Sequence, residues 1–147
     1  MLESQINKIL MKDSFTKKIF KNTLARDELP KTVKYPSCYV INTKPRSHEG
    51  EHWLAVFYDK NKIGYFFDSY GFNPSRYDLE NFMNKTSEKW YYNKKRIHGL
   101  STYCGYYCVL FILFKSRKLN FFSNFTSNYL LNDKKIYDLI NLFKKNK

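Results

Sequence analysis

Cys104 stands where a polar segment of the chain meets an apolar one. The polar residues 101–103 precede Cys104-Gly105, and an apolar run follows to about Phe114. This pattern predicts a buried helix with the cysteine in its first turn. The positive end of a helix dipole lowers the pKa of a nearby thiol, and the thiolate is the form that attacks a carbonyl carbon. We therefore expect Cys104 to be a nucleophile.

A cysteine nucleophile needs a base, and the base needs an acceptor that orients it. The sequence offers three histidines, which are His48, His52 and His98. His48 lies in a polar loop, where we expect it at the surface, and His98 lies in the segment that leads to Cys104. His52 begins the apolar stretch 52–58, which is typical of a strand covered on both faces. The partner of that strand decides whether His52 meets an acid.

The stretch that begins at His52 and the stretch that ends before Asp68 predict a β-hairpin around a turn at 59–62. In the register that pairs the strand ends directly, His52 lies opposite the residue after Asp68. A bulge at Gly64 would supply the correction of one residue. Side chains that face each other across two strands lie about 5 Å apart. The hairpin therefore predicts a histidine–carboxylate pair.

Each of these residues also has an ordinary structural interpretation. His52 beside Trp53 fits a hydrogen-bonded core histidine, Asp68 fits a turn former, and Cys104 fits a small buried hydrophobic residue. Cys108 lies one helical turn beyond Cys104 and is expected in the core. The joint arrangement of base, acid and thiol is what favours chemistry over packing.

The elements that must position these residues predict an α+β fold. We expect a central mixed or antiparallel β-sheet flanked by helices, with the nucleophile at the N-terminus of a buried central helix. The expected strands are 37–42, 52–58, 63–67 and 89–92. The expected helices are about 2–12, 13–20, 73–84, 104–114, 121–125 and 132–143. A length of 147 residues predicts a single domain, 1–147.

The number of cysteines and the lack of sorting signals indicate the cellular compartment in which we expect the protein. Three cysteines, Cys38, Cys104 and Cys108, are odd in number and are expected to be free thiols. The Cys-x3-Cys spacing of Cys104 and Cys108 is not a zinc pattern, and we predict no metal site. The N-terminus lacks the layout of a secretory signal, and no apolar run approaches the roughly 18 residues of a membrane span. We expect a soluble intracellular protein.

A formal net charge of +13 suggests a polyanionic partner, of which nucleic acid is the first candidate. The alternative is a solvated, lysine-rich surface, because an AT-rich genome would produce the same bias toward Lys, Asn, Ile, Phe and Tyr. The candidate phosphate contacts are Lys94, Lys95, Arg96, Lys115, Arg117, Lys118, Lys144 and Lys145.

An ordered set of motifs resembles the adenain-like cysteine proteases. This family includes the adenovirus maturation proteases and relatives in Maverick/Polinton elements and virophages, and it shares a fold with the SUMO-specific proteases. The motifs are His52-Trp53, Phe67-Asp68 with Gly71, Cys104-Gly105 with Tyr107-Cys108, and the lead-in from Cys38 to Arg46. The resemblance covers about residues 35–114 and, more weakly, the N-terminal helix.

The resemblance implies a role for each residue. Cys104 would be the nucleophile, His52 the general base and acid, and Asp68 the residue that orients His52. Trp53 and Gly105 would pack around the site, with Trp53 against the imidazole. Adenovirus-type enzymes have Glu at the third position, whereas Asp is common elsewhere in the fold. The chain order His, Asp, Cys is the reverse of the papain order.

One position departs from the family pattern. The family usually places a glutamine six or seven residues before the cysteine, where its amide and the backbone N–H of the cysteine form the oxyanion hole. Here His98 stands six residues before Cys104. An imidazole N–H can donate the same hydrogen bond. The alternative is a loop histidine exposed to solvent.

The resemblance also implies the biology. We expect a cysteine endopeptidase that cleaves capsid or core precursor polypeptides of a virus or transposon. The alternatives are an isopeptidase that removes ubiquitin or SUMO-like modifiers, and a catalytically weakened, basic DNA-binding core protein. The chemistry would require no cofactor, although DNA or an activating peptide would fit the family. We expect a monomer without membrane contacts, in the cytoplasm or nucleus of the host cell and packaged in the virion.

Overall fold

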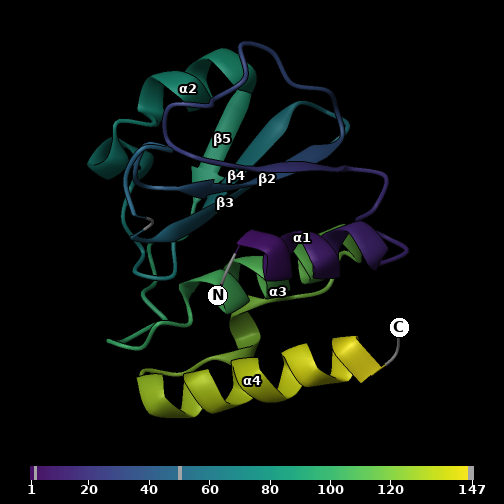
Figure 1. The fold of residues 1–147 in the computed structure, drawn as a ribbon, viewed down its shortest axis with the longest axis vertical. Helices are drawn as coiled ribbons and strands as arrows, with labels where there is room; N and C mark the ends of the chain where they lie inside the picture. Colours follow the sequence, from purple (N-terminus) through teal and green to yellow (C-terminus); the bar gives the residue numbers. More distant parts are fainter. Residues whose placement is uncertain (2, 50, 146–147) are drawn as a thin grey trace.

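The most apolar stretches of the chain lie in the middle of a five-stranded sheet in the computed structural model, which describes residues 1, 3–49 and 51–145 (Figure 1). The strands are β1 (Phe20–Leu24), β2 (Ser37–Asn42), β3 (Trp53–Tyr58), β4 (Ile63–Phe67) and β5 (Lys89–Tyr92), and they are neighbours in that order. The outer pairs β1–β2 and β4–β5 are parallel, whereas the inner pairs are antiparallel. The predicted α+β fold with a mixed sheet is confirmed.

Helices cover both faces of the sheet (Figure 1). On one face lie α1 (Glu3–Lys12) and α3 (Cys104–Ser116), and α4 (Tyr129–Lys145) packs on the side of α3 away from the sheet. The other face carries α2 (Glu80–Thr86), with the 3-10 helix η1 (Pro74–Tyr77) before it. A second 3-10 helix, η2 (Phe122–Asn124), precedes α4. No helix of the described chain is long and apolar enough to cross a membrane.

The central helix α3 begins at Cys104, as the sequence predicts. Apart from Tyr106, its residues from 104 to 114 are all buried. A helix that is apolar on all sides must be enclosed by the fold, and α3 lies between the sheet and α4, with α1 beside it. The predicted buried central helix is therefore confirmed.

Alternate strand residues serve two separate cores. In β3, Ala55 packs with α1 and α3, whereas Leu54 packs with α2. In β4, Phe66 belongs to the α2 side as well. This alternation follows from the period of two along a strand. Extended beyond the strand ends, it assigns both His52 and Asp68 to the α2 side of the sheet.

The β3–β4 hairpin is longer by one residue at its turn than the sequence predicts. Tyr58 pairs with Gly64, and the register then runs without a shift. The reason is the Asp59 side chain, which accepts a hydrogen bond from the backbone N–H of Ile63, while the N–H of Asp59 donates to the Ile63 carbonyl. Asp59 and Ile63 thus close the turn. The predicted register and the predicted bulge at Gly64 are wrong.

The helix predicted over 13–20 is also wrong. The Asp13 carboxylate accepts hydrogen bonds from the backbone N–H groups of Phe15 and Thr16, as a helix cap would, but the chain continues as turns. At Phe20 it enters β1, which pairs with β2 in parallel. Of the apolar residues that suggested a helix, Ile19 and Phe20 pack toward the α1–α3 core, whereas Phe15 is exposed beside Arg117.

Two other helices differ at their ends. The helix predicted over 73–84 is divided, because Asp78 adopts a left-handed backbone conformation (φ 57°) between η1 and α2. The last helix begins three residues earlier than predicted, at Tyr129. There the Asn128 side chain accepts a hydrogen bond from the N–H of Leu131 and so caps the helix. The start of the helix predicted over 2–12 falls on residue 2, which lies outside the described residues.

A buried ion pair joins the end of α1 to the end of α3. The guanidinium of Arg117 donates two hydrogen bonds to the Asp13 carboxylate, which has no exposed side-chain surface. Removal of one partner leaves a buried charge uncompensated. We expect Asp13→Ala to lower the free energy of unfolding by about 3–5 kcal/mol in urea titrations.

The matched control is Asp138→Ala, which removes the exposed ion pair between Lys134 and Asp138 on α4. Exposed pairs of this kind contribute less than about 1 kcal/mol. Equal losses for the two variants would contradict a stabilising role for the buried pair.

Candidate active site

Cys104 is the first residue of α3 and is 8% exposed. It lies in the wall of a cleft of about 630 Å³, to which His52, Trp53, Tyr70 and Ser101 also contribute. The helix has no side-chain cap at its N-terminal position, Tyr103. The first backbone N–H groups of α3 therefore have no capping side chain from Tyr103. They favour a negative charge on the sulfur and on any oxygen that reacts with it.

His52 and Asp68 form a buried hydrogen-bonded pair. The Nε2 atom of His52 lies 2.7 Å from Oδ1 of Asp68, and the Asp68 side chain is fully buried. Both residues lie just outside their strands and on the same side of the sheet. The observed register would place His52 opposite residue 70, so the pair forms along a diagonal and not directly across the strands. The hairpin predicted this pair for a register that proved wrong.

The structure also brings the Cys104 thiol to His52. The two groups are close enough to shift each other's pKa, and the backbone of Trp53 also helps to lower the pKa of the thiol. Because Nε2 of His52 is occupied by Asp68, Nδ1 is the ring nitrogen available to the thiol. The residues that the sequence predicted as nucleophile, base and acid are thus joined in one chain of contacts.

Asp68 is held by several donors besides His52. Its carboxylate accepts hydrogen bonds from the backbone N–H of Tyr70 (3.0 Å) and of Phe72 (3.2 Å), and from the hydroxyl of Tyr77 in η1. The side chain of Asn93 also holds the backbone of Asp68. Its amide oxygen accepts a hydrogen bond from the Asp68 N–H, and its amide nitrogen donates one to the Asp68 carbonyl. A carboxylate with this many donors is stabilised in its charged form.

The charges of the site follow from these contacts. Burial disfavours the imidazolium, but the hydrogen bonds to Asp68 and Cys104 outweigh it and raise the pKa of His52 to about 9. Burial also disfavours the thiolate, but His52 outweighs it and lowers the pKa of Cys104. The pKa of Asp68 is lowered despite burial, through His52 and Tyr77. The imidazolium and the thiolate thus favour each other's charged form, beside a carboxylate.

Gly71 allows the turn that follows Asp68. Its backbone has φ +78°, and its N–H donates to the Asp68 carbonyl at 2.8 Å. A Cβ at this position would lie 2.9 Å from the carbonyl oxygen of Lys94. The conformation and the lack of space both require glycine. This turn brings the backbone N–H groups of residues 70 and 72 to the Asp68 carboxylate.

Aromatic rings enclose the site, but the arrangement differs from the predicted one. Tyr70 stacks on the His52 ring with centroids 4.6 Å apart. Trp53 instead lies against Gly105, where an added Cβ would come within 3.2 Å of the indole and within 2.8 Å of the Met1 side chain. The indole N–H donates to the Met1 carbonyl at 3.1 Å. Trp53 and Gly105 thus pack together beside the site, and Tyr70 covers the imidazole.

His98 is fully buried, so the interpretation as an exposed loop histidine is wrong. Both of its ring nitrogens have partners: Nδ1 lies 2.9 Å from Oγ of Ser69, and Nε2 lies 2.8 Å from Oγ of Ser101. The ring is stacked on Tyr70 and does not line the cleft. Neither nitrogen is free to reach a substrate oxygen directly.

The sequence did not single out Tyr70, Tyr77 or Ser101. Tyr70 has the same strand parity as Asp68, and this signal could have found it. Tyr77 reaches Asp68 through the packing of η1, which no periodicity in the sequence reveals. Ser101 lies in the segment before Cys104, but its link to His98 is a tertiary contact.

The remaining candidates have other surroundings. His48 is exposed and belongs to the rim of the cleft. Cys38 and Cys108 are buried free thiols, and burial raises the pKa of each. Cys108 donates its S–H to the Trp53 carbonyl, as a core cysteine. Among the described residues, no group of three or more His, Cys, Asp or Glu side chains could hold a metal ion.

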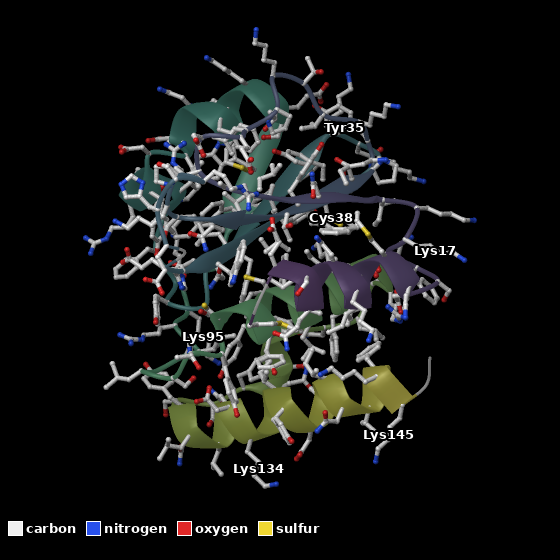
Figure 2. All side chains as sticks on the ribbon, in the orientation of Figure 1. Lys17, Tyr35, Cys38, Lys95, Lys134 and Lys145 are labelled. Atoms are coloured by element: carbon white, nitrogen blue, oxygen red, sulfur yellow. The ribbon has the colours of Figure 1, made fainter. Side chains whose placement is uncertain are left out.

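The predicted phosphate contacts divide into two groups. Six are exposed, namely Lys94, Lys95, Arg96, Lys118, Lys144 and Lys145, and Lys145 points away from the body of the molecule at the end of α4 (Figure 2). Three of these six also have partners within the chain: Lys95 with the Phe125 carbonyl, Arg96 with the His98 carbonyl, and Lys144 with the Tyr106 ring. The other two are half-buried, Lys115 against the Tyr65 ring and Arg117 beside Asp13. Arg117 in particular is committed to a buried ion pair.

Comparisons with known proteins give one likeness to report. No protein-family model matches the chain, and no curated protein does. Among similar solved structures is the selenomethionine crystal structure of ASFV pS273R protease, with 23% sequence identity and a TM-score of 0.46. The match covers 71% of this chain and 43% of that one, so this chain spans less than half the length of that protein.

Proposed function

We propose that the chain is a cysteine peptidase that acts through a thioester at Cys104. The observation that carries the proposal is the continuous set of contacts from the Cys104 sulfur through His52 to Asp68, placed at a helix N-terminus in the wall of a cleft. Any one of these residues has an ordinary structural explanation. A buried carboxylate, an imidazole and a thiol in series match the requirements of acyl transfer.

The reaction would use the preformed ion pair. The Cys104 thiolate attacks the carbonyl carbon of a peptide bond, and the carbonyl electrons move to the oxygen. As the C–N bond breaks, the His52 imidazolium gives its proton to the leaving amine. Neutral His52 then takes a proton from water as the water attacks the thioester. The C–S bond breaks, the new carboxyl end of the substrate leaves, and the site returns to a thiolate beside an imidazolium. Asp68 keeps the ring oriented and stabilises its positive charge throughout.

The substrate class is part of the proposal and is supported by the resemblance in sequence. Capsid or core precursors of a virus or transposon are the proposed substrates, with small residues beside the scissile bond. We further propose that the chain acts as a monomer inside the host cell or the virion. DNA is the proposed accessory partner, through the exposed lysines of α4 and of the loop before α3. An activating peptide remains a second proposal of the same kind.

Cleavage of a capsid precursor by wild type and by Cys104→Ala tests the reaction. We expect cleavage by the wild type and none by the variant, because no other thiol lies in the cleft. Cys108→Ala is the matched control, since this buried cysteine lies one turn further along the same helix. Full activity of Cys104→Ala would remove the proposed nucleophile.

Two alternatives remain as outcomes of related experiments. Efficient labelling of Cys104 by a ubiquitin-like vinyl sulfone would favour an isopeptidase over a precursor endopeptidase. Strong, salt-sensitive DNA binding together with an unreactive Cys104 would favour a DNA-binding core protein without activity. The intact hydrogen bonds around Asp68 support an active enzyme over a decayed site.

The pH dependence follows from the thiolate–imidazolium pair. We expect kcat/KM to rise with pH through the lowered pKa of Cys104, since protonation of the sulfur abolishes attack. It should fall again near pH 9, the pKa of His52, because the leaving amine then lacks its proton donor. A bell-shaped profile is therefore predicted. A rate that climbs continuously through pH 9 would indicate that the imidazolium has no part in the reaction.

The hydroxyl of Tyr77 offers a test of how Asp68 is held. Asp68→Asn should lower kcat by about 10²–10⁴-fold, because the ring of His52 loses its charged acceptor. Tyr77→Phe removes one donor among several and raises the pKa of Asp68, so a smaller loss is expected. Tyr137→Phe, on the exposed side of α4, is the control and should match wild type. An inactive Tyr77→Phe would assign the hydroxyl a direct role in the chemistry.

A further inference from the structure

A chain of hydrogen bonds crosses the loop before Cys104 and ends in the cleft. The hydroxyl of Ser69 lies 2.9 Å from Nδ1 of His98, and Nε2 of His98 lies 2.8 Å from the hydroxyl of Ser101. Ser69 and His98 are fully buried, whereas Ser101 lines the cleft together with Cys104. The chain therefore leads from the interior of the fold to the side of the nucleophile.

Helix α4 packs against the loop that carries Ser101 and holds it in place. Asn132 of α4 donates a hydrogen bond to the Ile97 carbonyl at 2.9 Å. A Cβ on Gly99 would lie 3.1 Å from that of Tyr129, so the helix and the loop are in close contact. A loop held at both points can keep a hydroxyl at a constant position beside Cys104.

The protonation state of His98 decides which hydroxyl has a proton to offer. Burial lowers the pKa of His98, so the ring is neutral near pH 7, with one donor and one acceptor nitrogen. With the ring proton on Nε2, this nitrogen donates to the Ser101 hydroxyl oxygen. Nδ1 then accepts from the Ser69 hydroxyl.

This arrangement leaves the Ser101 proton free. The Ser101 oxygen accepts from Nε2 of His98, and more weakly from the N–H of Tyr103 at 3.4 Å. Both lone pairs are then engaged, and the O–H bond must point away from the ring. Ser101 lines both the cleft that holds Cys104 and a second pocket beside Asp133, and the cleft is thus one of the directions open to the O–H bond.

We propose that the Ser101 hydroxyl is the side-chain donor of the oxyanion hole, with the backbone N–H of Cys104 as its companion. The proposal rests on the proposed peptidase function and names a further catalytic residue for it. His98 is a positioning residue, because it acts through Ser101 and does not reach the substrate. When the thiolate adds to the carbonyl carbon, the oxygen gains the electron pair and accepts these two hydrogen bonds. No proton moves to it.

Two reagents separate an oxyanion donor from a residue that merely supports the thiol. Iodoacetamide alkylates the Cys104 thiolate by direct displacement and forms no oxyanion. A p-nitrophenyl ester acylates the same sulfur through a tetrahedral oxyanion. Loss of one oxyanion donor costs about 10²–10³-fold in rate. For Ser101→Ala we expect acylation to fall by about 10²-fold while alkylation keeps the wild-type rate.

Three variants complete the measurement. Ser101→Thr keeps the hydroxyl and should retain acylation. Ser123→Ala, an exposed serine of η2, should match wild type in both reactions. His98→Leu should slow acylation, and adding it to Ser101→Ala should slow acylation no further, because the two residues act through one hydroxyl. An unchanged alkylation rate shows in each case that the protein is folded around Cys104.

Each outcome decides the matter. Acylation of Ser101→Ala at the wild-type rate, with an active wild type, overturns the role of Ser101 and leaves the peptidase function in place. An equal fall in both reactions overturns it too, since the serine would then act on the thiol. A wild type that is alkylated but neither acylated nor able to cleave a precursor overturns the peptidase function and, with it, the inference.

Discussion

The site depends on one buried carboxylate. Asp68 has no contact with solvent, and its charge is sustained by donors from three parts of the chain: His52 before β3, the turn at 70–72, and η1 through Tyr77. Asn93 holds its backbone. Burial of a charge is costly unless it is fully hydrogen-bonded. The elements on the α2 side of the sheet are therefore assembled around this group, and the orientation of His52 toward Cys104 follows from it.

Much of this arrangement could be predicted from local patterns. The apolar runs at β2, β3 and β4 and the all-apolar helix after Cys104 required burial on every side, which predicted a sheet with a central helix. The pairing of His52 with Asp68 followed from hairpin geometry even though the register was displaced by the longer turn at Asp59, because a diagonal neighbour on the same face is still within reach.

The parts that could not be predicted are set by tertiary contacts. β1 lacks regular alternation, and its pairing with β2 depends on the turns that follow Asp13. The burial of His98 depends on α4, far along the chain, which closes over the loop that leads to Cys104. A histidine in a polar segment gives no sign of such a cover. Its hydrogen-bonding partners, Ser69 and Ser101, are ordinary loop residues until the fold brings them to the ring.

The Tyr70 ring connects the two histidines of the site, His52 and His98. Its ring lies between two imidazoles, with centroids 4.6 Å from His52 and 5.0 Å from His98, and nearly parallel to both. In the proposed mechanism, His52 moves the proton, and Ser101, positioned by His98, donates to the developing negative charge. The Tyr70 ring thus sets the distance between the His52 and His98 rings. A change in its tilt would move both imidazoles. One side chain therefore fixes the positions of both the proposed acid–base residue and the proposed oxyanion donor.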